Sequence, residues 1–147
     1  MSGHMVVHGA LVTLVAPVGA VVLRHMSVPA VLAWSFFIAV QWAVHLPALV
    51  GTAPGWPGYA ALEHVLLLMS AIVFWIPVLR RGAGAQVALY LFLAVPATDL
   101  IGLALMARGQ PAEAVGMIVG MLPLAIAAVV ATWRWLAREE EQALAHG

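Results

Sequence analysis

The 147-residue chain contains no cysteine and no lysine. The lack of cysteine excludes disulfides, thiolate metal sites and cysteine nucleophiles. All six basic residues are arginine, and six acidic residues balance them to a formal net charge of zero, so no basic patch indicates nucleic-acid binding. Charged residues make up only 8% of the chain, hydrophobic residues 65%, and the mean hydropathy is +1.06. This composition predicts a protein whose solvent is membrane lipid.

Five long apolar segments, separated by short polar stretches, make up most of the chain. Each is long enough to cross the hydrocarbon core of a bilayer as an α-helix. They cover residues 5–23, 27–50, 59–79, 85–107 and 112–136, and a solvated tail follows over residues 137–147. No basic region precedes the first segment, so we expect a permanent span rather than a cleaved signal peptide. The predicted fold is therefore all-α, with residues 1–147 forming one polytopic membrane helix bundle of five transmembrane helices.

The positions of the arginines predict how the bundle is oriented. With the N-terminus outside, five of the six arginines lie on the inner side of the membrane, and only Arg108 remains outside. Arginine is enriched in cytoplasmic loops, so the sequence favours an N-out, C-in arrangement.

In this orientation, histidines from three spans converge on the outer leaflet. The first two are four residues apart, a spacing that places both imidazoles on one face of a helix. Ionisable groups inside a membrane usually mark a functional site, and imidazole nitrogen with thioether sulfur suits copper, especially Cu(I). The candidate metal ligands are His4, His8, His45 and His64. We expect His8, His45 and His64 to form a three-coordinate Cu(I) site, with His4 contributing less.

Carboxylates and methionines near the same leaflet are candidates to support this site. They are Glu63, Asp99, Glu113, Met117 and Met121. Glu63 points about 100° away from His64 on a helix, which favours a structural role. Asp99 lies about two turns deep, where a lone charge is costly, so we expect it to be protonated or paired with Arg108 or a histidine. The two methionines lie four residues apart, and at that spacing packing is the more common role.

Two further features have structural alternatives. His45 is followed closely by Pro47, so its ring has the alternative role of satisfying a backbone carbonyl that the proline releases. Gly116 and Gly120 form a GxxxG motif, which favours close helix approach either within the bundle or in an oligomer.

Four segments resemble, in the same order, parts of the CtaG-like cytochrome c oxidase assembly-factor family. HMVVHGALVTLVAP is similar to its HMxxH motif, apolar run and Ala-Pro, and WAVHLPALV to its Trp-His-x-Pro segment. ALEHVLLLMSAIVFWIPVL resembles its next helix, and ATWRWLAREEE its last helix with an acidic tail. The family's Asp-Gln before that helix is replaced here by Ala112-Glu113.

The resemblance implies the C-terminal five spans of that family, in a bacterial cell membrane. The arginine positions predict that the metal site lies toward the outer face. The resemblance also implies copper as the cofactor and a respiratory oxidase subunit or copper donor protein as partner. The implied metal residues are His4, His8, His45 and His64.

Three hypotheses of different classes follow. The first is a copper-binding membrane protein that assists assembly or metallation of a haem–copper oxidase. The second is a haem-b protein with histidines as axial ligands. The third is a structural accessory subunit of a respiratory complex that binds no metal. An enzyme has the least support, because the sequence shows no nucleophile with a partner base.

Overall fold

The computed structural model describes residues 3–50, 55–81 and 84–146, and all regular structure within these ranges is helical. Five helical stretches are long and apolar enough to cross a membrane, which confirms the predicted all-α class and number of spans. The first stretch combines three consecutive elements, and each of the other four is one helix. The elements are α1 (Gly3–Ala10), the π-helix η1 (Leu11–Val15), α2 (Ala16–Leu23), α3 (Ala30–Val50), α4 (Tyr59–Arg81), α5 (Ala85–Ala107) and α6 (Pro111–His146).

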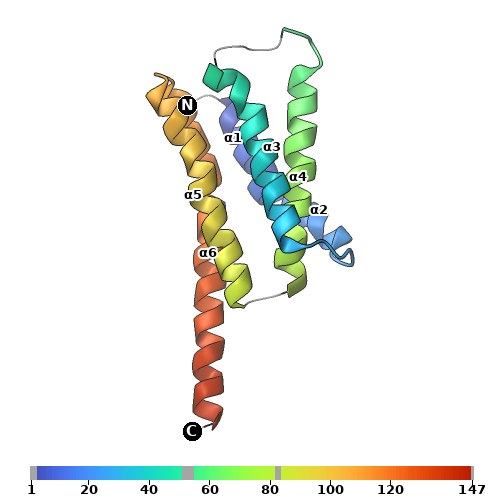
Figure 1. Ribbon diagram of the computed structural model, residues 1–147, viewed down its shortest axis with the longest axis vertical. Helices are drawn as coiled ribbons and strands as arrows, with labels where there is room; N and C mark the ends of the chain where they lie inside the picture. Colours follow the sequence, from blue (N-terminus) through green and yellow to red (C-terminus); the bar gives the residue numbers. More distant parts are fainter. Residues whose placement is uncertain (1–2, 51–54, 82–83, 147) are drawn as a thin grey trace.

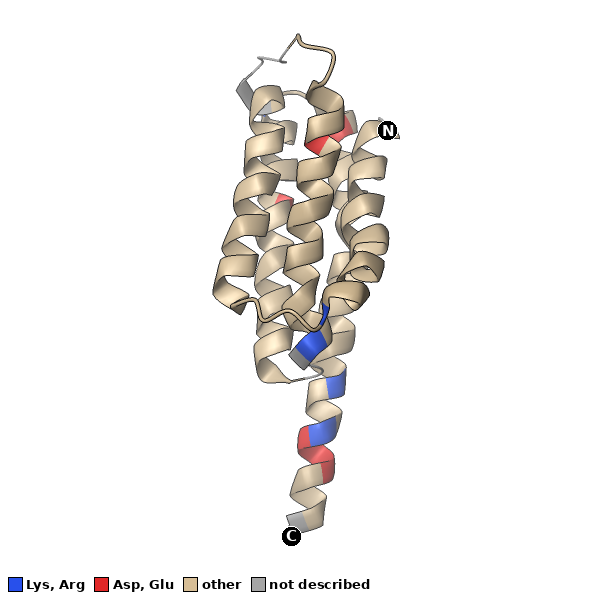
Figure 2. Cartoon of the chain, turned by 90° about the vertical axis from the view of Figure 1, so that its right-hand side faces the viewer, with Lys and Arg blue, Asp and Glu red and all other residues tan. Residues whose placement is uncertain are grey.

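The spans run alternately up and down, and the two ends of the chain lie at opposite ends of the bundle (Figure 1). Helix α5 packs along α6, α3 packs along α4, and the first span lies between α4 and α6. Helix α6 continues well past its neighbours as a single helix that includes the predicted tail. Basic residues gather mainly around the end where α6 leaves the bundle (Figure 2). We call this the arginine end, and the opposite end, which carries His4 and His8, the histidine end.

A π-helical turn interrupts the first span shortly before Pro17. The N–H of Ala16 bonds to the carbonyl of Leu11, five residues earlier, instead of to Val12. In this register the Val12 carbonyl would pair with the next backbone N–H, but Pro17 has none to donate. The indole N–H of Trp75 on α4 donates to that carbonyl instead, at 2.8 Å. The interruption therefore ties the first span to α4.

Aromatic side chains from three helices pack together in the half of the bundle nearer the arginine end. Phe37 on α3 and Phe74 on α4 are fully buried, with ring centroids 4.4 Å apart. Tyr90 on α5 stacks on Phe74 at 4.8 Å, and its hydroxyl donates a hydrogen bond of 2.9 Å to the Phe74 carbonyl. Lipid is as apolar as these rings, so the cluster stabilises the bundle through van der Waals packing rather than through removal of apolar surface from water. This cluster fixes α4, which carries His64, relative to α3, which carries His45.

Helices α1 and α6 cross at two glycines, Gly9 and Gly120. A Cβ on Gly9 would collide with the backbone of Gly120, and a Cβ on Gly120 would lie 3.1 Å from the Cα of Gly9. Gly116, the other glycine of the GxxxG motif, is buried. Gly120 therefore permits close helix approach within the chain, and the predicted oligomer through Gly116 and Gly120 stays a prediction. Because Gly9 follows His8 directly, the crossing also sets the position of that histidine.

Candidate metal centre

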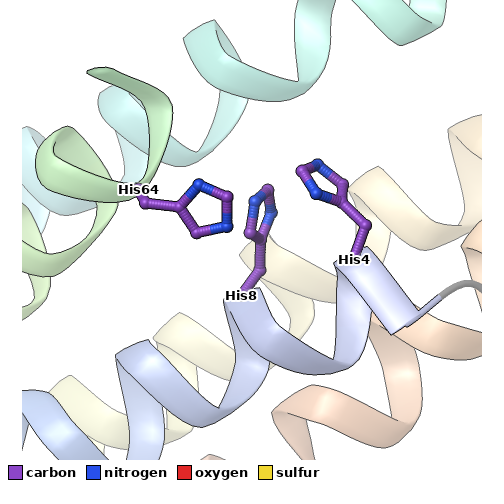
Figure 3. A group of neighbouring side chains, drawn as sticks. All are labelled: His4, His8 and His64. Carbon is purple, nitrogen blue, oxygen red and sulfur yellow. The ribbon is translucent and has the colours of Figure 1, made fainter. Parts of the chain in front are cut away.

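Three histidines from two helices meet at the histidine end. His4 and His8 lie one turn apart on α1, with ring centroids 4.1 Å apart, and His64 reaches them from α4. Figure 3 shows the ring of His8 between the other two. One ring nitrogen from each histidine can be chosen such that all three lie within 4.8 Å of one another. This His4–His8–His64 triad could hold a metal ion, because nitrogens that close need only small rotations to reach bonding distances of about 2 Å.

His8 is the most enclosed member of the triad. Its side chain is 1% exposed, and neither ring nitrogen has a hydrogen-bond partner among the described residues. A buried polar group without a partner costs on the order of 1–3 kcal/mol, so native proteins rarely keep one without a function. His4 is 43% exposed and lies where an ion would enter from outside the bundle. The triad therefore has an accessible side and a buried side.

Backbone contacts orient the rings of His64 and His45 as metal ligands. The Nδ1 of His64 lies 2.5 Å from the carbonyl oxygen of Ala60, and the Nδ1 of His45 lies 2.7 Å from that of Gln41. A carbonyl can only accept, so each Nδ1 carries the proton and each Nε2 is left with a free lone pair. Protein metal sites use this arrangement to fix the tautomer and orientation of a ligating histidine.

Glu63 belongs to the same cluster, although its helical position predicts a direction away from His64. Its carboxylate Oε1 lies 3.6 Å from the Nε2 of His4 and 3.6 Å from the Nε2 of His8, and the residue is only 7% exposed. Although the two residues are adjacent on α4, both Glu63 and His64 reach the histidines of α1. Glu63 therefore contacts the histidines of α1 and adds one negative charge to the triad.

The grouping of the histidines differs from the expected trio of His8, His45 and His64. The triad contains His4 in place of His45. His45 lies next to the triad, with its ring centroid 5.5 Å from that of His8, and it is 1% exposed. Its Nδ1 contacts Gln41, so the ring does not serve the carbonyl that Pro47 releases. Its Nε2 is buried without a partner among the residues with a described placement. His45 thus stands as a fourth imidazole on the buried side of the triad.

The structure places the other predicted residues outside this triad. Met117 and Met121 are buried in the hydrophobic core of the bundle, in line with the packing alternative. Glu113 is half-buried in the first turn of α6. Asp99 forms no ion pair with Arg108 or with any histidine within the described ranges. It lies instead in a groove between α5 and α6.

Gln41 is a residue that the sequence reasoning missed. It is fully buried, and neither atom of its side-chain amide has a partner in the described part of the chain. It lies one turn deeper in the bundle than His45, whose ring contacts its backbone carbonyl. The available signal was a lone glutamine four residues before a histidine inside an apolar span, a spacing that puts both on one face.

Three imidazoles and a nearby carboxylate form a donor set used by several transition metals. Imidazole suits copper, zinc, iron and nickel alike, so the ligands alone do not select one. On the side of the buried His8, water has little access to a bound ion. Such a site favours metals that accept low coordination numbers, among them Cu(I) and Zn²⁺.

Comparison with protein-family models, with curated proteins and with solved structures finds no significant match to this chain.

Proposed function

We propose that this chain is a copper-binding membrane protein that assists the assembly or metallation of a respiratory haem–copper oxidase. The observation that carries the copper part is His8, a fully buried imidazole whose two nitrogens have no hydrogen-bond partner in the described chain, in contact with three other histidines. An ion between His8, His4 and His64 would satisfy groups that are otherwise buried at a cost.

The proposed resting site is the His4–His8–His64 triad, with copper held as Cu(I). Cu(I) accepts two or three ligands and binds imidazole well, and the protein provides three imidazoles at close range. Glu63 lies within 3.6 Å of two of them and offsets the positive charge of the ion. His45 offers a fourth nitrogen beside His8, so ligand exchange can move the ion between an exposed and a buried position.

Haem b is less well supported by the same geometry. A porphyrin needs a flat space between its two axial imidazoles. The centroid of the His8 ring lies only 4.1 to 5.5 Å from the ring centroids of the other three histidines. A haem between two of these rings would have to force that pair apart.

The link to an oxidase rests on the resemblance of four segments to the CtaG-like assembly factors. The proposed orientation puts the histidine end outside, because the arginines gather at the opposite end. Reporter fusions after residues 25, 55 and 82 and at the C-terminus test this orientation. They should read inside, outside, inside and inside, and a C-terminus found outside would contradict it.

The copper site is tested by anaerobic Cu(I) titration of the purified, metal-free protein in detergent against a chromogenic Cu(I) chelator. Wild-type protein should be nearly colourless and bind about one Cu(I) per chain. Removal of the central ligand in His8→Ala should lower the affinity at least about 100-fold. His25→Ala is the matched control, because His25 lies at the arginine end, where its Nδ1 faces the carbonyl of Val22.

Three results would contradict the copper site. Equal Cu(I) affinity of wild-type and His8→Ala protein would show that the ion binds elsewhere. A stoichiometric Soret band in the purified protein would favour haem, and a lack of any metal binding would favour the structural accessory subunit. The role in assembly needs a cellular measurement: an oxidase matured without this chain should contain less copper but normal haem. Wild-type protein should restore the copper, and His8→Ala should not.

A further inference from the structure

Asp99 is an acidic residue deep in the membrane, outside the histidine cluster. It lies eight residues before Ala107, the last residue of α5, which corresponds to about 12 Å along the helix. The hydrocarbon core of a bilayer is about 30 Å thick, so this position is well below the surface. Asp99 is half-buried and makes no hydrogen bond or ion pair with any residue that the structure describes. Intramembrane carboxylates almost always have such a partner.

Asp99 lines an apolar groove on the outer surface of the α5–α6 pair. A hollow of about 380 Å³ surrounds it, lined among others by Phe92, Pro96, Ala125, Ala128 and Val129. A second hollow of about 280 Å³ shares three of these residues and extends toward the arginine end past Thr132 to Leu136. The two form one continuous groove. Along α6 it runs from Ala125 to Leu136, about 16 Å, or three helical turns.

The groove has the features of a helix-docking surface. Its α6 wall carries the small residues Ala125 and Ala128, which allow close approach of another helix. Pro96 has no N–H to donate to the carbonyl of Phe92, so this carbonyl lacks its usual helical donor and offers a second acceptor near Asp99. Two acceptors in an otherwise apolar groove call for a donor on whatever occupies it.

A second copy of this chain and a lipid both fail to supply that donor. All six arginines lie at or beyond the ends of the apolar segments, so none reaches the level of Asp99. His8 and His45 are buried within the bundle, and His4 and His64 are turned toward His8 in the triad, so they are directed away from the groove on α5 and α6. The cationic groups of lipids lie at the membrane surface, and an acyl chain in the groove would leave the carboxylate unmatched.

We propose that the α5–α6 groove is the docking site for a transmembrane helix of another membrane protein, which presents a lysine or arginine at the level of Asp99. The apolar walls provide the packing, and the carboxylate selects a helix with a basic residue at mid-membrane depth. This proposal does not depend on the metal site, which lies on α1 and α4.

The test measures binding of two synthetic single-span peptides of leucine and alanine in lipid vesicles by energy transfer. One peptide carries a central lysine, and the other carries leucine there. The protein is labelled through a single cysteine added at its C-terminus, which is unique because the chain contains none. Wild-type protein should prefer the lysine peptide by about threefold to twentyfold, the range expected for polar contacts between membrane helices.

Two pairs of variants separate the charge from the groove. Asp99→Asn should remove the preference for lysine without abolishing binding. Ala128→Phe fills the groove and should weaken binding of both peptides, whereas its matched control Leu93→Phe lies in a different hollow, between α3 and α5, and should not. Unchanged circular dichroism and an unchanged SDS unfolding transition show that each variant is folded.

Several outcomes would overturn the proposal. Equal binding of the two peptides to wild-type protein, or a preference that survives Asp99→Asn, would remove the role of the carboxylate. Energy transfer between two labelled copies that Asp99→Asn abolishes would assign the groove to a homodimer. A copurifying phospholipid that Ala128→Phe expels and Asp99→Asn does not affect would assign it to lipid.

Discussion

Glu63 and Asp99 are both carboxylates within apolar spans, but their surroundings differ. Glu63 is 7% exposed and lies between two histidines of α1, each 3.6 Å from its carboxylate. Asp99 is half-buried in a groove on the surface of the bundle and has no partner in the described chain. A lone charge in lipid is costly. Glu63 has neighbouring histidines within its own bundle, whereas Asp99 needs a partner from outside the chain. The two therefore respond differently when their environments are changed.

Removing the partners of Glu63 should have the largest effect. In His4→Ala/His8→Ala protein, the largely buried carboxylate loses both neighbouring imidazoles, and the free energy of unfolding should fall by about 1–3 kcal/mol. Adding Glu63→Leu to this double variant removes the unpaired group and should recover a large part of that loss. Unfolding by SDS in mixed micelles measures both changes. If the third substitution only adds a further loss, Glu63 is not paired with these histidines.

Changing Glu63 itself should affect metal binding more than folding. Glu63→Gln keeps the shape but removes the negative charge beside His4 and His8, so Cu(I) affinity should fall about 10- to 100-fold. The chelator competition described above measures this. Glu113→Gln is the comparison, since Glu113 lies in the first turn of α6 and outside the triad, and it should leave the affinity nearly unchanged. Equal losses in both variants would point to a general effect of charge.

The glycine crossing holds α1, and with it both histidine partners of Glu63, in place. Gly9→Ala places a methyl group against the backbone of Gly120 and should cost about 1–3 kcal/mol of stability and also weaken Cu(I) binding. Gly3→Ala on the same helix meets nothing within 4 Å and should change neither quantity. A Gly9→Ala protein that matches wild type in both measurements would show that the two helices separate easily.

Asp99 should show the smallest effect in the isolated protein. Asp99→Leu removes no hydrogen bond or ion pair with any described residue, so the free energy of unfolding should change by no more than about 0.5 kcal/mol. The Cu(I) dissociation constant should stay within about twofold of wild type. SDS unfolding and copper titration on the same preparation check both expectations. A large destabilisation would mean that the isolated chain already satisfies this carboxylate.

The spans were predictable because lipid imposes a simple requirement on sequence. A helix must present about 20 mostly apolar residues, and the predicted segment 85–107 coincides with α5 (Ala85–Ala107). The predicted segment 59–79 differs from α4 (Tyr59–Arg81) only at its end, where two arginines continue the helix into the interface. Helix α6 extends to His146, because its polar tail still consists of good helix formers.

The site was predictable in its members but not in its arrangement. Sequence places His4, His8, His45 and His64 at similar depth, because depth follows from position along a span. Which histidines face one another depends on how each helix is rotated about its axis, and this rotation is set by packing. The contact between Gly9 and Gly120 and the bond from Trp75 to Val12 join residues that are far apart in sequence. For this reason His4 rather than His45 completes the triad.

The π-helical turn at Leu11–Val15 changes how the first half of the first span is rotated about the helix axis relative to the second half. Each residue of an α-helix advances the side-chain direction by about 100°, so one extra residue rotates everything before it by that angle relative to everything after it. Deleting one residue from this turn would remove the extra residue, although Pro17 would still leave one backbone carbonyl without a helical donor. It would also swing His4 and His8 about a quarter of a turn away from Glu63 and His64, unless α2 rotated instead and lost its contact with α4. The length of this short apolar segment is therefore constrained as tightly as the identity of the histidines that precede it.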